Sequence, residues 1–180
     1  MSKKIKPLEP PDNLHLQAAE GWLELGDSFE ANEELEKISP SLRIHSDVLE
    51  LRWQIYTKEK RWNAGADIAR AITELAPGRV SGWIHLAYSL RRKKDGGLQT
   101  AWEVLLPVVE KFPMQPVVAY NLACYACQMK QMDAARHWIK RVFEIAGEIN
   151  RFDEIRLMAL DDSDLEPLWT EFPSSSVKAS

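Results

Sequence analysis

One apolar pattern of 17 residues recurs along this chain. RWNAGADIARAITELAP (61–77) aligns with GLQTAWEVLLPVVEKFP (97–113) and QMDAARHWIKRVFEIAG (131–147), and an earlier copy begins at Ala31. The anchor residues are Ala31, Gly65, Ala101 and Ala135, so successive copies are spaced by 34, 36 and 34 residues. A period of this length made of two helical patterns predicts an array of helix pairs, in which each pair buries its apolar face against the next.

The pattern divides the chain into four units, which cover residues 13–40, 45–77, 80–113 and 116–147. Residues 1–12 contain three prolines and predict a flexible N-terminal lead. We expect residues 148–172 to form capping helices that cover the last unit, because this unit would otherwise expose an apolar face. Ser163 and Glu166 have the spacing of a capping box, which predicts a short final helix through Trp169. Residues 173–180 predict a disordered tail.

Two features distort the third unit. Its turn, residues 93–97, is two residues longer than the neighbouring turns and accounts for the spacing of 36. Pro107 lies inside its second predicted helix, where a proline costs about 3 kcal/mol unless the helix bends. We therefore expect a kink at Pro107.

The charge of the chain limits its partners. The net charge of -4 argues against binding to nucleic acid or to an anionic membrane. The basic run 91–94 ends a predicted helix, where cations complement the helix dipole. No run approaches the roughly 18 apolar residues of a membrane span, and the basic N-terminus lacks the apolar core of a secretory signal. We therefore expect a cytoplasmic protein.

The four units resemble tetratricopeptide repeats (TPR), most clearly at Trp83, Leu86, Ala87 and Leu90, which follow the pattern W-x-x-L-A-x-x-L. The C-terminal run IRLMALDDSDLEPLW also resembles the closing segment of bacterial proteins of this class. The resemblance implies an all-α fold, a right-handed α-solenoid of about four helix-turn-helix repeats plus C-terminal capping helices. In that family the first helix of each pair lines a concave groove, which binds a peptide or a partner helix.

The groove positions of the family can be carried over to this sequence. They fall on Glu20 and Glu24 in the first unit and on four residues in each later unit: Asp47, Glu50, Gln54 and Lys58; His85, Tyr88, Arg91 and Arg92; Asn121, Cys124, Cys127 and Gln128. We expect partner binding through six of the residues in the last three units: Gln54, His85, Tyr88, Arg92, Asn121 and Gln128. Tyr88 would supply contact area, and Arg92 and Asn121 would bind polar groups.

Cys124 and Cys127 form a C-x-x-C pair inside a predicted helix. A redox pair normally lies at a helix N-terminus in a βαβ unit, and a zinc site needs two more ligands, for which His85 is the only plausible addition. Close helix packing is the preferred interpretation. A thiol redox or metal sensor that uses Cys124 and Cys127 is the alternative of another class.

The sequence contains no phosphate-binding loop, no dinucleotide-binding glycine motif and no H-E-x-x-H motif. We therefore expect a protein–protein interaction scaffold or adaptor, with no enzymatic activity, no cofactor and no bound metal. A client-specific chaperone of a secretion or assembly system is an alternative. Self-association through Trp102 or Trp138 also stays open.

Overall fold

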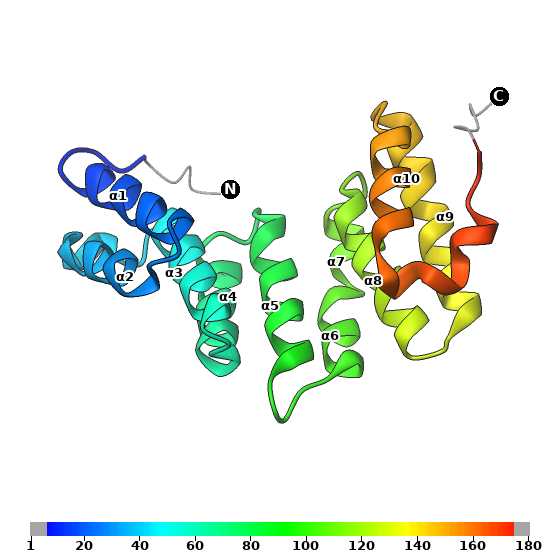
Figure 1. The fold of residues 1–180 in the computed structure, drawn as a ribbon, viewed down its shortest axis with the longest axis horizontal. Coiled ribbons are helices and arrows are strands. Elements are labelled where there is room, and N and C mark those ends of the chain that lie inside the picture. Colours follow the sequence, from blue (N-terminus) through cyan, green and yellow to red (C-terminus); the bar gives the residue numbers. More distant parts are fainter. Residues whose placement is uncertain (1–6, 175–180) are drawn as a thin grey trace. The chain divides into compact units, whose positions relative to one another are not determined.

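The structure is a computed structural model that describes residues 7–174, and this part of the chain contains helices and no strands (Figure 1). It forms two compact units, Met1–Asp95 and Gly96–Ser180. The boundary lies in the long turn of the third predicted repeat, so the two halves of that repeat belong to different units. Residues 1–6 of the predicted lead and 175–180 of the predicted tail lie outside the described residues.

Within its described residues, 7–95, unit 1 contains five α-helices, coloured blue to green in Figure 1: α1 (Asp12–Glu24), α2 (Ser28–Lys37), α3 (Ser46–Lys58), α4 (Trp62–Leu75) and α5 (Val80–Arg92), with a short 3-10 helix η1 (Pro40–Leu42) after α2. Helix α1 packs against α2, α3 against α4, and α4 against α5. Helix α3 also contacts both α1 and α5. The first helices of successive pairs are therefore neighbours, around a core that includes Leu35, Ile38, Val48 and Ile55.

The packed structure begins before residue 13, where the sequence placed the first repeat. Leu8 packs against the core of unit 1, and Asp12 is buried at the start of α1. The carboxylate of Asp12 accepts hydrogen bonds from the backbone N–H of Ser39 at 2.6 Å and from its hydroxyl group at 3.1 Å. Local composition gives no sign of this contact, because the two residues are 27 positions apart.

The turn that ends a first helix has the same geometry three times. Gly26, Lys60 and Lys130 have positive φ angles of 95°, 57° and 61° and lie five residues before the anchors Ala31, Gly65 and Ala135. In each turn the next N–H donates to a carbonyl five residues back, from Asp27 to Trp22, from Arg61 to Tyr56 and from Gln131 to Ala126, at 2.8–2.9 Å. This is the hydrogen-bond pattern of a Schellman motif. The sequence period thus has a counterpart in the backbone.

Unit 2 contains α6 (Leu98–Leu105), α7 (Val108–Lys111), α8 (Pro116–Gln128), α9 (Met132–Glu148), α10 (Phe152–Asp161) and the 3-10 helix η2 (Ser163–Glu171). Helix α8 packs against α6, α7, α9 and η2, and its middle residues are almost all buried. Helix α6 ends at Leu105 and α7 begins directly after Pro107, which confirms the predicted distortion at this proline.

The last helix of the described residues, η2, packs against other helices of unit 2. Helix η2 contacts α8 and α10, and its Leu165 and Leu168 are fully buried. The predicted capping box of Ser163 and Glu166 is wrong, because Asp162 is the N-cap and accepts a hydrogen bond from the backbone N–H of Asp164 at 3.0 Å. None of the helices within residues 7–174 combines the length and apolar composition needed to cross a bilayer.

Candidate functional site

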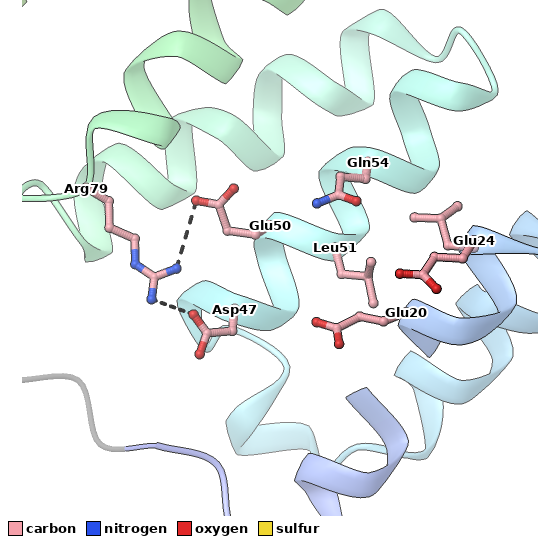
Figure 2. Close-up of a pocket in the computed structure, with 8 residues that line it drawn as sticks. Glu20, Glu24, Asp47, Glu50, Leu51, Gln54 and Arg79 are labelled. Carbon is pink, nitrogen blue, oxygen red and sulfur yellow. Dashed lines mark hydrogen bonds and ion pairs between the residues drawn. The ribbon is translucent and has the colours of Figure 1, made fainter. Parts of the chain in front are cut away.

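A pocket of about 520 Å³ lies in unit 1 beside α1 and α3 (Figure 2). Its lining comes from one face of each helix and from the residue before α5: Glu20, Leu23 and Glu24; Asp47, Glu50, Leu51 and Gln54; and Arg79. Residues three or four positions apart share a helix face, which brings these side chains to one hollow. The buried side chains of Leu23 and Leu51 supply the apolar part of the lining.

Arg79 and Glu50 organise one end of the pocket. The guanidinium group of Arg79 forms an ion pair with Asp47 and lies 3.9 Å from the carboxylate of Glu50 (Figure 2). Glu50 also accepts hydrogen bonds from the Ser81 hydroxyl group and from the His85 imidazole. Burial raises the pKa of Glu50, but the hydrogen bonds from His85 and Ser81, with the nearby positive charges, outweigh it and leave the pKa below its ordinary value. The Glu50 carboxylate is therefore ionised at neutral pH.

The predicted residue His85 connects this pocket to a group of aromatic side chains. Its imidazole stacks on the indole of Trp53, with ring centroids 3.5 Å apart and an interplanar angle of 12°. The Trp53 indole N–H donates to the hydroxyl group of Ser89 at 2.9 Å. Tyr88 packs edge-on against Trp53, with centroids 5.8 Å apart. His85 is thus held between a carboxylate and an aromatic ring from α3.

Arg92 extends this cluster toward α4. Its guanidinium carbon lies 3.5 Å from the centre of the Tyr88 ring and 5.7 Å from that of Trp62, both within the range of a cation–π interaction. Its Nη1 also donates to the carbonyl group of Tyr88 at 3.2 Å. The structure therefore brings together the three predicted residues of α5, and Gln54 lines the neighbouring pocket with Glu50.

Two predicted residues lie elsewhere. Asn121 and Gln128 are half-buried on α8 of unit 2. The side-chain amide of Asn121 donates to the carbonyl group of Val117, one turn earlier, at 2.8 Å. Their membership in one groove with the residues of unit 1 stays a prediction.

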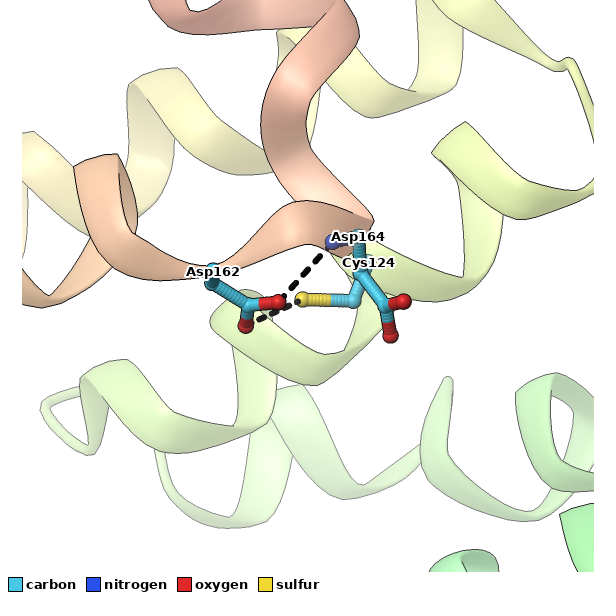
Figure 3. Close-up of side chains that lie close together, drawn as sticks. All are labelled: Cys124, Asp162 and Asp164. Carbon is cyan, nitrogen blue, oxygen red and sulfur yellow. Dashed lines mark hydrogen bonds between the residues drawn. The ribbon is translucent and has the colours of Figure 1, made fainter.

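Cys124 and Cys127 are both buried free thiols, as the packing interpretation expects. Asp162 lies beside Cys124, with its carboxylate 3.6 Å from the sulfur atom (Figure 3). Burial, together with the charges of Asp162 and Asp164, raises the pKa of both thiols. Redox exchange needs the thiolate, so this environment opposes a reactive pair.

Potential metal ligands gather around Cys124, as the metal alternative supposed, but its neighbours there are not Cys127 and His85. One ligand atom each of Cys124, Asp162 and Asp164 lie within 4.8 Å of one another. His85, the expected additional ligand, instead binds Glu50 in unit 1. Asp162 already accepts hydrogen bonds from Tyr120, Cys124 and the Asp164 backbone, which accounts for its position without a cation.

The sequence predicted only some of the residues that line the pocket of unit 1. Asp47 and Glu50 appear among the carried-over groove positions, whereas Arg79 has no signal in the repeat pattern. The distance along the chain could have paired Glu50 with His85, because they are 35 residues apart, close to one repeat period. Adjacent first helices bring such positions together.

Comparison with known proteins does not assign this chain to a family. No protein-family model matches the chain, and no curated protein matches it significantly.

Proposed function

We propose that this protein is a TPR-like interaction module, an α-solenoid of helix pairs that binds a segment of a partner protein without catalysing a reaction. The binding site in this proposal is the pocket of unit 1, together with the neighbouring cluster of His85, Tyr88 and Arg92. The observation that carries the proposal is that one open pocket is lined by successive first helices, with buried leucines and charged side chains side by side. Peptide-binding surfaces combine apolar contact area with polar groups that orient the ligand.

The chemistry of the pocket supports a binding role. Its eight lining residues include no hydroxyl, thiol or amine nucleophile. Ser81 and His85 lie nearby, but each bonds to a different oxygen of Glu50 and the hydroxyl group has no bond to the imidazole. A serine nucleophile is commonly activated by a base that it bonds directly, and Ser81 has no such bond to His85.

The test is affinity capture from a lysate of the source cell, followed by mass spectrometry. Gln54→Trp would fill the pocket from an exposed position on α3, and Asn63→Trp places the same side chain at an exposed position on α4, away from the pocket. We expect a partner that the wild type and Asn63→Trp retain and that Gln54→Trp loses. A double variant, Tyr88→Ala with Arg92→Ala, should also lose it while keeping its helical spectrum. Equal capture by all four proteins would refute the proposal.

A further inference from the structure

The charges that line the pocket are unevenly matched. Four carboxylates, from Glu20, Glu24, Asp47 and Glu50, face one guanidinium group, that of Arg79. Arg79 is engaged with Asp47 and Glu50 at one end. At the α1 end, Glu20 and Glu24 form no ion pair and no side-chain hydrogen bond with any residue in 7–174. This end of the pocket therefore carries two carboxylates that are not paired with a cation.

Apolar side chains lie directly beside these two carboxylates. Glu20 and Glu24 are one helical turn apart on the same face of α1, so their carboxylates can act on one ligand group. Figure 2 shows both carboxylates directed from α1 toward Leu51 of α3. Leu51 and Leu23 are 4% and 9% exposed, so the lining there is apolar and fixed. A ligand that fits must combine an aliphatic stem with a positive tip, which is the form of a lysine or arginine side chain.

One cation of the chain itself, Lys58, lies near this end of the pocket and is already hydrogen-bonded. The ammonium group of Lys58, on α3, donates to the backbone carbonyl of Leu23 at 2.8 Å. This contact shows that a lysine can approach the end of α1, and it holds Lys58 on a neutral acceptor. Neither Lys58 nor any other basic side chain within residues 7–174 forms an ion pair or a hydrogen bond with Glu20 or Glu24.

We propose that the α1 end of the pocket binds a lysine or arginine side chain of the partner segment. The cation lies between the carboxylates of Glu20 and Glu24, its aliphatic stem packs on Leu23 and Leu51, and the side-chain carbonyl of Gln54 is the further acceptor. This inference rests on the proposed function and defines its ligand as a basic segment. The selectivity is electrostatic, so it weakens as the salt concentration rises.

The experiment uses the full chain and a short fluorescein-labelled peptide in which lysines alternate with alanines, followed by fluorescence anisotropy. A matched peptide carries glutamine in place of each lysine. The test variant is Glu20→Gln with Glu24→Gln. The control variant is Glu33→Gln with Glu74→Gln, which removes two exposed carboxylates from α2 and α4 and therefore has the same net charge.

We expect the lysine peptide to bind the wild type and the control variant about 10-fold more tightly than the test variant. The glutamine peptide should bind all three proteins weakly. Equal affinity of the test and control variants would overturn the inference, and so would equal affinity of the two peptides. Residues 1–6 contain three lysines, so a further variant replaces Lys3, Lys4 and Lys6 with glutamine. If the lysine peptide binds tightly to this variant but not to the wild type, the inference is also overturned, because the occupant would then be the chain's own segment.

Failure of this inference is distinguishable from failure of the proposed function. If Gln54→Trp loses the captured partner but Glu20→Gln with Glu24→Gln binds the lysine peptide normally, the pocket binds a partner through other chemistry. If Gln54→Trp retains the partner, the proposed function itself is refuted, whatever the peptides do.

Discussion

Asp162 accepts a hydrogen bond from the hydroxyl group of Tyr120, 42 positions earlier in the chain, at 3.0 Å. The same carboxylate caps η2 and lies beside Cys124, so one side chain joins the C-terminal segment to α8 (Figure 3). Burial raises the pKa of Tyr120, and the hydrogen bond to Asp162 raises it further. The hydroxyl group therefore stays protonated and remains a donor.

Replacement of Asp162 by alanine should lower the free energy of unfolding by about 1–3 kcal/mol, because Tyr120 and the N-terminus of η2 lose their acceptor. Tyr120→Phe should cost about 1 kcal/mol, because it removes only the hydroxyl group. Urea denaturation measures both effects. The two losses should not add in the double variant, since the residues share one interaction. Asp161→Ala, at the exposed neighbouring position, is the control, and an equal loss there would contradict this role of Asp162.

The buried thiols should react slowly. Burial and the negative charges of Asp162 and Asp164 raise the pKa of Cys124 and Cys127, so little thiolate exists at neutral pH. We expect Ellman's reagent to label the native protein at least about 100-fold more slowly than the urea-unfolded chain. Asp162→Asn should increase the native rate at Cys124. Rapid labelling of both thiols in the native wild type would instead favour the redox alternative.

The contribution of Glu50 to stability should depend on pH. Its pKa in the folded protein is below the ordinary value of 4.5, because the hydrogen bonds from His85 and Ser81 outweigh the effect of burial. A depressed folded pKa stabilises the protein above the unfolded pKa, and this stabilisation is lost as the pH falls through the folded pKa. Glu50→Gln should therefore be less stable than the wild type near neutral pH, and the difference should shrink as the pH falls below the ordinary pKa of 4.5 and through the lower folded pKa.

Urea denaturation across this pH range measures the difference between the two proteins. Glu33→Gln serves as the control, because Glu33 is exposed on α2. A difference between the wild type and Glu50→Gln that is constant with pH would show that the carboxylate contributes no charge-dependent stability.

Local signals were sufficient for much of the fold. The helix boundaries at Trp62 and Val80 follow from apolar periodicity, and the break at Pro107 follows from the chemistry of proline. Each of these features depends on residues close together in the chain. The sequence could therefore predict the helix pairs before any long-range contact was known.

The details of the site depend on contacts about one repeat apart. Arg79 reaches Asp47 across 32 positions, and it lies in the loop before α5, outside the repeated pattern. Asp162 became the N-cap of η2 in place of Ser163, because its carboxylate also accepts the Tyr120 hydroxyl group. Asp162 and Ser163 were alternative N-caps, and a capping motif in the sequence takes account only of neighbouring residues, not of the distant Tyr120.

The left-handed residue in the turn between α3 and α4 offers a way to stabilise unit 1. Lys60 has a φ angle of 57°, which costs a side-chain-bearing residue about 1–2 kcal/mol, whereas glycine adopts it freely. Lys60→Gly should therefore raise the free energy of unfolding by about 0.5–1 kcal/mol, after the greater freedom of glycine in the unfolded chain is subtracted. Glu59→Gly, at a φ angle of -81°, should instead be destabilising. Urea denaturation of the two variants should give changes of opposite sign, and a destabilising Lys60→Gly would contradict the strain at Lys60.

Gly82 provides the sharpest test of the packing between α4 and α5. A methyl group at this position would lie 2.7 Å from Cγ2 of Ile72 and 3.3 Å from the backbone nitrogen of Thr73, closer than side chains normally approach. Alanine in place of glycine stabilises a helix by about 1 kcal/mol, but overpacking a tight contact costs about 1–3 kcal/mol. Because Ile72 is fully buried and Thr73 contributes backbone, the contact cannot relax cheaply, and Gly82→Ala should lower the free energy of unfolding.

The matched control for Gly82→Ala is Gly21→Ala, in α1 of the same unit, where an added methyl group meets nothing within 4 Å. The same chemical change should there raise the free energy of unfolding by up to about 1 kcal/mol, because only helix propensity acts. Thermal or urea denaturation measures the effect of both variants. A stabilising Gly82→Ala would mean that α4 and α5 lie farther apart than the structure places them, and the positions of Glu50 and His85 at the pocket would then need revision as well.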